Sequence, residues 1–167
     1  LDLIKQFALE FPEMESISAE VKGETRDEML IDAEQYRNVS EAVTIKLPLT
    51  KEGLKACKYL SDAGVKTNVT LCFSVAQAVM TSIAGATYIS PFVGRMNDNS
   101  FSGVELVRAI GGLYQAKRSE TKVLAASLRD VHHVSRCLLY GADVVTLPTS
   151  VFDKMYDHVL TREGLSI

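Results

Sequence analysis

Long apolar runs and an excess of one charge are both missing from this sequence of 167 residues. Its longest apolar stretches fall far short of the roughly 20 residues that a membrane-spanning helix needs. The net charge is −3, whereas nucleic acids and anionic membranes attract proteins with a basic surface. We therefore expect neither a membrane nor a nucleic acid among the partners of this protein.

Cysteine and histidine are sparse, and their positions indicate neither disulfides nor a metal site. Cys57, Cys72 and Cys137 are odd in number and far apart, which predicts reduced thiols in or near the core. His132 and His133 lie in a predicted helix with no partner at metal-ligand spacing. We interpret them as surface residues and expect no metal.

Two further sequence motifs are absent. No G-x-G-x-x-G follows a predicted strand, which counts against a dinucleotide-binding sheet. The first residues do not show the charged and apolar regions of a signal peptide. Together with the reduced thiols, this predicts a cytoplasmic protein.

What the sequence does contain is a regular alternation of strand and helix patterns. Apolar residues make up 47% and charged residues 23% of the chain, which is enough for the core of one domain. Strands are predicted at residues 17–21, 43–47, 67–72, 87–92, 122–126 and 143–147. Helices are predicted at residues 25–38, 50–63, 74–84, 101–117, 131–140 and 150–158.

Short turns with glycine connect several helices to the strands that follow them. Gly64, Gly85 and Gly141 each end a predicted helix and precede a predicted strand, as expected for a residue that accepts a positive φ. No linker or low-complexity stretch divides the chain. Repeated β/α units predict a parallel sheet, either an open doubly wound sheet or part of a closed barrel.

The most informative residue is Lys46, near the end of the β-branched strand at residues 43–47. Burial in a low-dielectric interior disfavours the charged ammonium, and a neutral amine is a nucleophile that forms a Schiff base with a carbonyl. The alternative is a lysine whose long stem reaches from the strand end into solvent. The neighbouring strands bear on this choice.

Polar side chains share one face of three predicted strands, and apolar residues such as Val69 and Leu71 take the opposite face. In an open sheet, helices cover both faces and leave such polar positions hard to satisfy. In a β/α barrel, the polar face points inward and its upper layer is an active site. The pattern therefore favours a barrel. The polar residues are Ser18, Glu20, Thr44, Lys46, Asn68 and Thr70.

Each of these polar residues also has a simpler interpretation. Glu20 could end in solvent, Thr70 could bond to the backbone, and Asn68 could start a turn. Together, however, an amine, a carboxylate, an amide and a hydroxyl supply what carbonyl chemistry requires: a nucleophile, a proton carrier and hydrogen-bond donors. We predict an active site of this kind at one end of the sheet.

Arginines follow two later strands and predict an anion site. Arg95 comes just after residues 90–94, and Arg129 follows Ser127 near the start of a helix. Arginine forks and helix N-termini bind phosphate, and β/α barrels frequently place a phosphate site on their late strands. The alternative is two solvated arginines in loops.

Four segments, in this order, resemble the transaldolase family. Residues 46–54 resemble its Schiff-base lysine strand, residues 68–77 the following strand, residues 89–95 the next one, and residues 126–129 its phosphate-binding strand end. The resemblance covers nearly the whole chain and is greatest for the small microbial or phage-type transaldolases. It implies an α/β fold, a (β/α)8 TIM barrel of class I aldolase type, and a reaction without metal or cofactor.

The resemblance also implies the catalytic roles. Lys46 would attack the C2 ketone of a ketose phosphate, and Glu20 would exchange protons through a water that Thr70 helps to hold. Cleavage would leave a dihydroxyacetone unit on Lys46, for transfer to an aldose phosphate. The donor would be sedoheptulose 7-phosphate or fructose 6-phosphate, in the pentose phosphate pathway.

The substrate-binding roles follow from the same resemblance. Asn68 and Ser90 would hold the hydroxyl groups of the dihydroxyacetone unit, so the partners of the protein would be sugar phosphates. The phosphate group would be bound by Arg95, Ser127 and Arg129.

Fructose-6-phosphate aldolases share the implied fold and lysine, and they are the alternative within this resemblance. They carry glutamine at the position of Glu20 and tyrosine at the position of Phe92, so both residues favour a transaldolase. A tyrosine there could activate water to hydrolyse the intermediate. A phenylalanine cannot, so the enamine would persist until an acceptor arrives.

The resemblance accounts for about six of the eight β/α units of a barrel. The first strand with its catalytic aspartate, the second strand with a Thr-Thr-Asn-Pro-Ser turn, and the final helix have no match. We therefore expect residues 1–167 to form a single partial barrel domain, strands 3 to 8 of a longer protein.

A partial barrel exposes strand edges and apolar surface. We therefore expect the isolated chain to fold poorly and to be nearly inactive. The alternative of another class is a truncated, inactive barrel that only binds sugar phosphates. Small members of the family are often ring-like assemblies, which implies a homo-oligomer for the longer protein.

Overall fold

The computed structural model describes residues 1–166 and shows strands and helices that alternate around one sheet. The strands are β1 (Ile17–Glu20), β2 (Val43–Pro48), β3 (Thr67–Cys72), β4 (Tyr88–Pro91), β5 (Lys122–Ala125) and β6 (Val144–Val145). The helices are α1 (Asp2–Glu10), α2 (Arg26–Arg37), α3 (Lys51–Asp62), α4 (Val75–Ile83), α5 (Val93–Asp98), α6 (Gly103–Lys117), α7 (Val131–Leu139), α8 (Thr149–Lys154) and α9 (Val159–Gly164).

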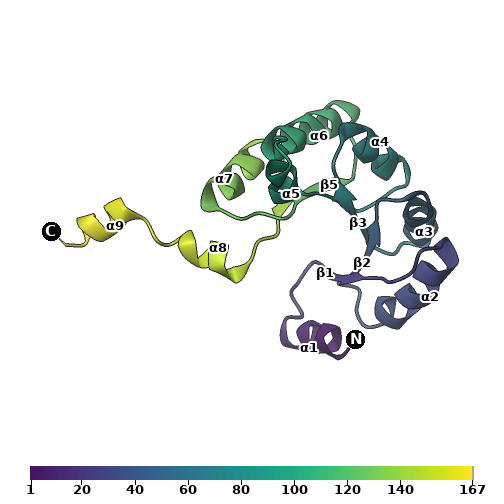
Figure 1. Ribbon diagram of the computed structural model, residues 1–167. Coiled ribbons are helices and arrows are strands. Elements are labelled where there is room, and N and C mark those ends of the chain that lie inside the picture. Colours follow the sequence, from purple (N-terminus) through teal and green to yellow (C-terminus); the bar gives the residue numbers. More distant parts are fainter. Residues whose placement is uncertain (167) are drawn as a thin grey trace.

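The strands form a curved parallel sheet in the order β1-β2-β3-β4-β5-β6. Figure 1 shows them as an arc, with α2, α3, α4, α6 and α7 on its convex side. The concave side faces the gap between α1 and α8, and α9 extends away from the rest of the molecule (Figure 1). The architecture is a partial (β/α)8 barrel, which confirms the predicted fold class.

Side-chain caps start several helices where the sequence predicts them. Thr25 Oγ1 accepts from the backbone N–H of Glu28, and the Glu28 carboxylate accepts from the backbone N–H of Thr25, which is the predicted capping box of α2. Thr50 caps α3 through a hydrogen bond of 3.0 Å from the N–H of Gly53. The predicted helix ends are marked by the positive φ angles of Gly64 (76°), Gly85 (78°) and Gly141 (98°).

The apolar core lies between the sheet and the helices on the convex side. One cluster around Ile45 and Leu60 joins β1, β2 and β3 to α2 and α3, and a second around Ile89 and Ile110 joins β3, β4 and β5 to α4, α6 and α7. These four side chains are fully buried, and each contributes roughly 1.5–3 kcal/mol through burial. Because the convex face carries the core, the concave face can carry polar side chains.

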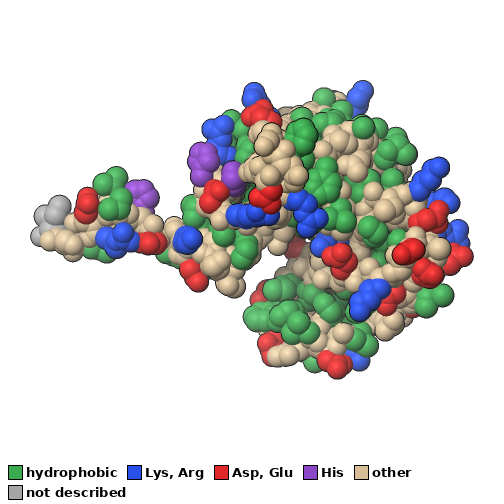
Figure 2. All heavy atoms as spheres, in the orientation of Figure 1, with side chains coloured by type: hydrophobic (Ala, Val, Ile, Leu, Met, Phe, Trp, Pro, Cys, Tyr) green, Lys and Arg blue, Asp and Glu red, His purple; other side chains and the backbone are tan. Residues whose placement is uncertain are grey.

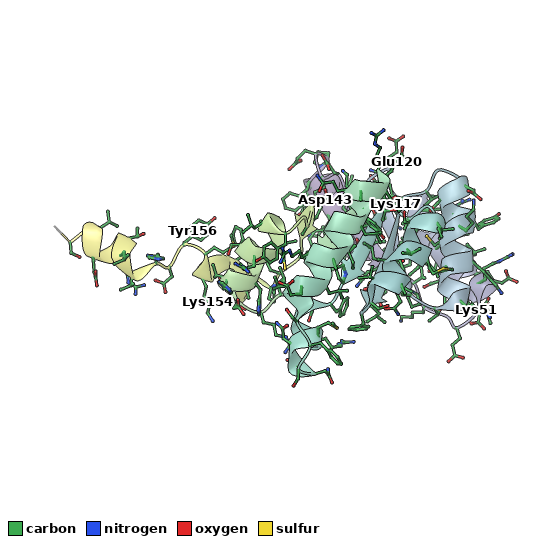
Figure 3. All side chains as sticks on the ribbon, turned by 90° about the horizontal axis from the view of Figure 1, so that it is seen from above. Lys51, Lys117, Glu120, Asp143, Lys154 and Tyr156 are labelled. Carbon is green, nitrogen blue, oxygen red and sulfur yellow. The ribbon has the colours of Figure 1, made fainter. Side chains whose placement is uncertain are left out.

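The carboxyl ends of the parallel strands all lie at one end of the molecule. Figure 3 places Lys117, Glu120 and Asp143 together at the end where β5 and β6 begin, and it places Lys51, which opens α3 after β2, toward the opposite end. Active sites of β/α barrels lie at the carboxyl ends of the strands. The end marked by Lys51 is therefore where a site is expected.

The paired glycines of α6 do not interrupt the helix. Gly111 and Gly112 lie within its continuous span. A Cβ atom on Gly111 would lie 2.9 Å from the carbonyl oxygen of Tyr140, so this glycine permits close contact between α6 and the end of α7. A Cβ on Gly112 would meet no atom within 4 Å.

The structure differs from the predicted bounds near its C-terminal end. The strand predicted at residues 143–147 is shorter and comprises only β6, because β5 ends at Ala125 and has no further residues for it to pair with. The helix predicted at residues 150–158 is the shorter α8, after which His158 caps α9. Val151 is the only buried residue of α8, and a helix without further apolar contacts is not extended.

The cysteines behave as predicted. Cys57, Cys72 and Cys137 are buried and form no disulfide. Burial raises the pKa of all three thiols, to about 11 for Cys72 and for Cys137. Within residues 1–166, no helix combines the length and the apolar composition that crossing a membrane requires.

Candidate active site

The ammonium group of Lys46 contacts a carboxylate on the neighbouring strand. Lys46 lies in β2, Glu20 ends β1, and the parallel register places the two residues opposite each other. Lys46 Nζ donates a hydrogen bond of 2.7 Å to Glu20 Oε2. The structure therefore brings together two of the predicted site residues, although their roles stay a prediction.

The lysine is half-buried, and the carboxylate is open to solvent. The side chains of Lys46 and Glu20 are 26% and 55% exposed, so the structure lies between the two interpretations of Lys46, a buried amine and a side chain that reaches solvent. The amine becomes nucleophilic only after it loses a proton, and the Glu20 carboxylate lies within hydrogen-bond distance to accept that proton.

Two buried polar side chains on β3 and β4 lie beside this pair. Asn68 is in register with Lys46, and Ser90 Oγ donates a hydrogen bond of 2.8 Å to Asn68 Oδ1. Asn68 is 2% exposed and Ser90 is 1% exposed. An unpaired polar group in such a place costs about 1–3 kcal/mol, so the hydrogen bond stabilises both side chains in these positions.

Thr70 lies two residues beyond Asn68 on β3 and is also buried. Its Oγ1 has no hydrogen-bond partner among the described residues, so the alternative that this hydroxyl bonds to the backbone is wrong. Buried hydroxyls of folded proteins nearly always bind a protein group or a water. The Thr70 hydroxyl therefore keeps an unused hydrogen-bonding capacity inside the sheet.

Strand β3 becomes irregular directly after Thr70. Leu71 adopts a φ of 64°, and the pairing register shifts between Val69 and Cys72. Cys72 packs in the core and Leu71 is half-buried, so the expected place of Leu71 on the apolar face is wrong, because the bulge reverses the alternation. The raised pKa of Cys72 keeps its thiol protonated at neutral pH, and a protonated thiol is a poor nucleophile.

Phe92 and Arg95 lie at the start of α5, a helix that sequence patterns did not predict. The Arg95 guanidinium lies over the Phe92 ring, 5.0 Å from its centroid, which is within the range of a cation–π contact. The Phe73 ring packs edge-on against Phe92 at 5.9 Å between centroids. Arg95 is thus exposed, as in the simpler interpretation, but it lies on a helix and is oriented by an aromatic ring.

Ser127 and Arg129 lie in the loop between β5 and α7. Ser127 has a φ of 60°, a strained conformation for a residue other than glycine and one that recurs at functional sites. Both residues line a hollow of about 380 Å³ with Leu128 and residues 146–148. Arg129 Nη1 donates to Asp98 Oδ1 on α5, so a carboxylate binds one side of this guanidinium.

Gly94 allows α5 to contact this loop closely. Backbone hydrogen bonds run from Val93 N to Ala126 O at 2.9 Å and from Gly94 N to Ser127 O at 3.0 Å. A Cβ on Gly94 would lie 2.2 Å from Ser127 O and 2.8 Å from Arg129 Nε. Sequence reasoning did not identify Gly94 and Asp98 as residues of the candidate site. The only signal for Gly94 was its position directly before Arg95.

His133 is half-buried, so the expectation of two surface histidines is wrong for this residue. Its Nδ1 lies 2.6 Å from Asp130 Oδ2, and its Nε2 lies 3.2 Å from Asn97 Nδ2. The Asn97 amide donates to Nε2 when this nitrogen carries no proton, whereas the close contact of Nδ1 with Asp130 does not have the geometry of a hydrogen bond. In the part of the chain that the structure describes, no three His, Cys, Asp or Glu side chains gather as metal ligands.

Two solved structures share this fold. A GMP reductase of Trypanosoma brucei, in complex with guanosine 5′-monophosphate, matches 81% of this chain and 30% of its own, with a TM-score of 0.62 and 18% identity. An inosine 5′-monophosphate dehydrogenase of Legionella pneumophila matches 89% of this chain and 48% of its own, with a TM-score of 0.63 and 15% identity. At these identities the likeness concerns the fold alone.

Sequence relatives are much closer. A "Probable transaldolase" of Caulobacter vibrioides (strain NA1000 / CB15N) is 48% identical over 149 residues, which cover 89% of this chain and 69% of that protein. A "Probable transaldolase 2" of Bacillus anthracis is 44% identical over 169 residues, which cover 98% of this chain and 76% of that protein. The family described as Transaldolase/Fructose-6-phosphate aldolase matches residues 1–166. The chain therefore belongs to the transaldolase/fructose-6-phosphate aldolase family.

Proposed function

We propose that the protein is a transaldolase. It transfers a dihydroxyacetone unit from a ketose phosphate, sedoheptulose 7-phosphate or fructose 6-phosphate, to an aldose phosphate. The observation that carries this proposal is the 2.7 Å contact between Lys46 Nζ and Glu20 Oε2. Family membership supports the reaction class, and the position of the pair near the carboxyl ends of β1 and β2 supports its place in an active site.

Lys46 forms the Schiff base once it has given up a proton. Glu20 accepts this proton from the ammonium group, and the neutral amine attacks the C2 carbonyl carbon to give a carbinolamine. Glu20 then returns a proton to the C2 oxygen, which leaves as water. A water bound to the Thr70 hydroxyl relays these protons, which fits a buried hydroxyl without a partner among residues 1–166.

The iminium ion accepts the electrons of the C3–C4 bond when that bond breaks. A base removes the proton of the C4 hydroxyl, the aldose phosphate departs as an aldehyde, and an enamine remains on Lys46. Asn68 and Ser90 hold the hydroxyl groups of this dihydroxyacetone unit. The resemblance assigns the base to an aspartate that matches no residue of this sequence, so assays of transfer use a chain that also carries it.

The anion site holds the phosphate group of the sugar. Arg95 and Arg129 supply charged N–H donors, and Ser127 supplies a hydroxyl in the loop after β5. Arginine forks suit a phosphate because several N–H groups point in one plane. The hollow that Ser127 and Arg129 line supports this assignment.

Phe92 favours transfer over hydrolysis of the enamine. Its ring carries no hydroxyl and packs between Phe73 and the Arg95 guanidinium. It therefore does not activate a water, and the enamine persists until an aldose phosphate adds to it. An aldolase of the same family would instead release free dihydroxyacetone without an acceptor.

Borohydride trapping tests the proposal. With fructose 6-phosphate, reduction of the imine should leave a stable adduct that mass spectrometry of peptides locates on Lys46. Lys46→Arg keeps the charge but removes the nucleophile, so the adduct should be lost. Lys66→Arg is the matched control, because Lys66 is also half-buried but donates to the carbonyl oxygen of Glu15 at the other end of β1.

The outcomes separate the three candidate activities. The absence of an adduct on the unmodified protein would refute the enzyme and leave a barrel that only binds sugar phosphates. In a chain that turns over, release of free dihydroxyacetone at a high rate without an aldose acceptor would identify an aldolase. Dependence on the acceptor supports the transaldolase.

A further inference from the structure

We propose that Asp98 is a positioning residue that holds Arg129 ready for the phosphate group of a sugar phosphate. The inference rests on the proposed function, because it takes Arg129 as a phosphate ligand. Asp98 lies between two of the four segments that were used to identify the resemblance, which end at Arg95 and resume at Ala126. Its role follows from the contacts of α5.

Arg129 lies along one face of α5. Gly94 and Asp98 are four residues apart, so they share that face of the helix. A Cβ on Gly94 would come within 2.8 Å of Arg129 Nε, and Asp98 Oδ1 accepts from Arg129 Nη1. The glycine thus leaves room for the guanidinium, and the carboxylate binds it.

Asp98 can orient Arg129 only if α5 itself is fixed. The backbone bonds of Val93 and Gly94 to the loop after β5 fix its first turn. At its other end, Asn97 Oδ1 accepts from Gly103 N at 3.0 Å, and Asn97 Nδ2 lies 3.2 Å from His133 Nε2. The starts of α6 and α7 therefore both hold the end of α5 from which Asp98 projects.

The ion pair leaves part of the guanidinium free. Arginine has five N–H donors in a planar fork, and Asp98 uses Nη1. The side chains of Arg129 and Asp98 are 54% and 48% exposed, and Figure 2 shows basic and acidic side chains next to each other over α5. Solvent and salt therefore weaken the repulsion between Asp98 and an incoming phosphate.

Restricting the conformations of the Arg129 side chain before the ligand arrives favours binding of the phosphate group. A free arginine side chain loses much rotamer entropy when a ligand orders it, and the contact with Asp98 removes part of that loss in advance. We expect this gain to exceed the screened repulsion. Asp98 should therefore raise the affinity for phosphorylated sugars and leave the affinity for unphosphorylated ones unchanged.

The test compares two ligands in borohydride trapping. In Asp98→Ala, the concentration of fructose 6-phosphate that gives half-maximal trapping on Lys46 should rise five- to tenfold, whereas that of dihydroxyacetone should stay within twofold. Asp98→Asn, which keeps the shape and one acceptor oxygen, should give a smaller rise. Glu105→Ala is the matched control, because Glu105 is another exposed carboxylate paired with an arginine, Arg108, at 3.6 Å.

Arg129→Ala completes a double-mutant cycle. Asp98→Ala should add nothing in the Arg129→Ala background, because the positioned group is then absent. An unchanged or lower half-maximal concentration of fructose 6-phosphate in both Asp98 variants would overturn the inference. If Arg129→Ala itself has no effect on fructose 6-phosphate, the phosphate role of Arg129 fails and the inference fails with it. Equal losses for both ligands would show a structural role and also overturn it.

Discussion

Lys46 and Arg129 each contact a carboxylate, but the two pairs are held in different ways. Lys46 and Glu20 lie in adjacent strands, and backbone pairing sets their register. Arg129 lies in a loop and Asp98 at the end of a six-residue helix, so side-chain contacts and a close glycine hold them together. Strand pairing alone places Lys46 next to Glu20. The contact between Arg129 and Asp98 depends instead on how a loop and a short helix pack against each other.

The largest effect is expected for the pair on adjacent strands, Lys46 and Glu20. Glu20→Gln keeps the size of the side chain but removes its ability to take a proton. Aldolases of the same family keep the lysine with a glutamine at this position, so the rate of adduct formation on Lys46 should fall by about 10²-fold, the lower end of the contribution of a general acid–base group. Rapid-quench borohydride trapping measures the rate, with the exposed Glu34→Gln in α2 as the control. A fall of less than threefold would contradict the role of Glu20.

The contact between Arg129 and Asp98 should be disrupted most easily by a substitution of Gly94. Gly94→Ala places a Cβ at 2.2 Å from Ser127 O, and such overpacking costs about 3 kcal/mol in the free energy of unfolding. Gly112→Ala is the matched control, since its Cβ would meet nothing within 4 Å and a helical alanine stabilises by about 0.5–1 kcal/mol. Denaturant unfolding should therefore show opposite signs. If Gly94→Ala and Gly112→Ala changed the free energy of unfolding in the same direction, α5 would be able to move away from the loop.

A smaller effect is expected at the buried bond between β3 and β4. Ser90→Ala removes the donor that binds Asn68 Oδ1, and the oxygen is left unpaired at a position only 2% exposed. The free energy of unfolding should fall by about 2 kcal/mol. Ser82→Ala, which removes a half-buried hydroxyl bonded to Ser119, should cost less in the same measurement. Equal losses in the free energy of unfolding for the two variants would mean that burial does not determine how much each hydrogen bond contributes.

The smallest effect should come from the anchor of α5. Asn97→Ala removes the bond to Gly103 N and the contact with His133. Because Asn97 is exposed, stability should fall by only about 1 kcal/mol. Half-maximal trapping of fructose 6-phosphate should need about twice the concentration, with no change for dihydroxyacetone. A larger change for dihydroxyacetone would mean that α5 supports Lys46 rather than Arg129.

The sequence predicted the strand-borne part of the site well, because period two and parallel pairing are local rules. Glu20, Lys46 and Asn68 share a face in the sequence pattern, and the register places them side by side. The pattern failed at Leu71, where a bulge follows Thr70, because no local feature of that strand distinguishes a bulge from continued alternation. It also left open whether Lys46 is buried or reaches solvent, and the structure shows a half-buried side chain.

The loop-borne part was less predictable, because its contacts join distant segments. Asp98 and Arg129 are 31 residues apart, and neither the charge pattern nor the helix pattern pairs them. Arg95 was placed in a loop because α5 has only six residues, too few for a periodic pattern. The half-buried position of His133 likewise depends on Asn97, from another helix.

The sequential strand order has a consequence for synthesis of the chain. Each described strand after β1 pairs with the strand made just before it, so such a strand finds this partner already in place when it emerges from the ribosome. Contacts between nearby segments of a chain form quickly. The contact between Lys46 and Glu20, separated by 26 residues, can therefore form while the segment that carries Arg129 has yet to be translated.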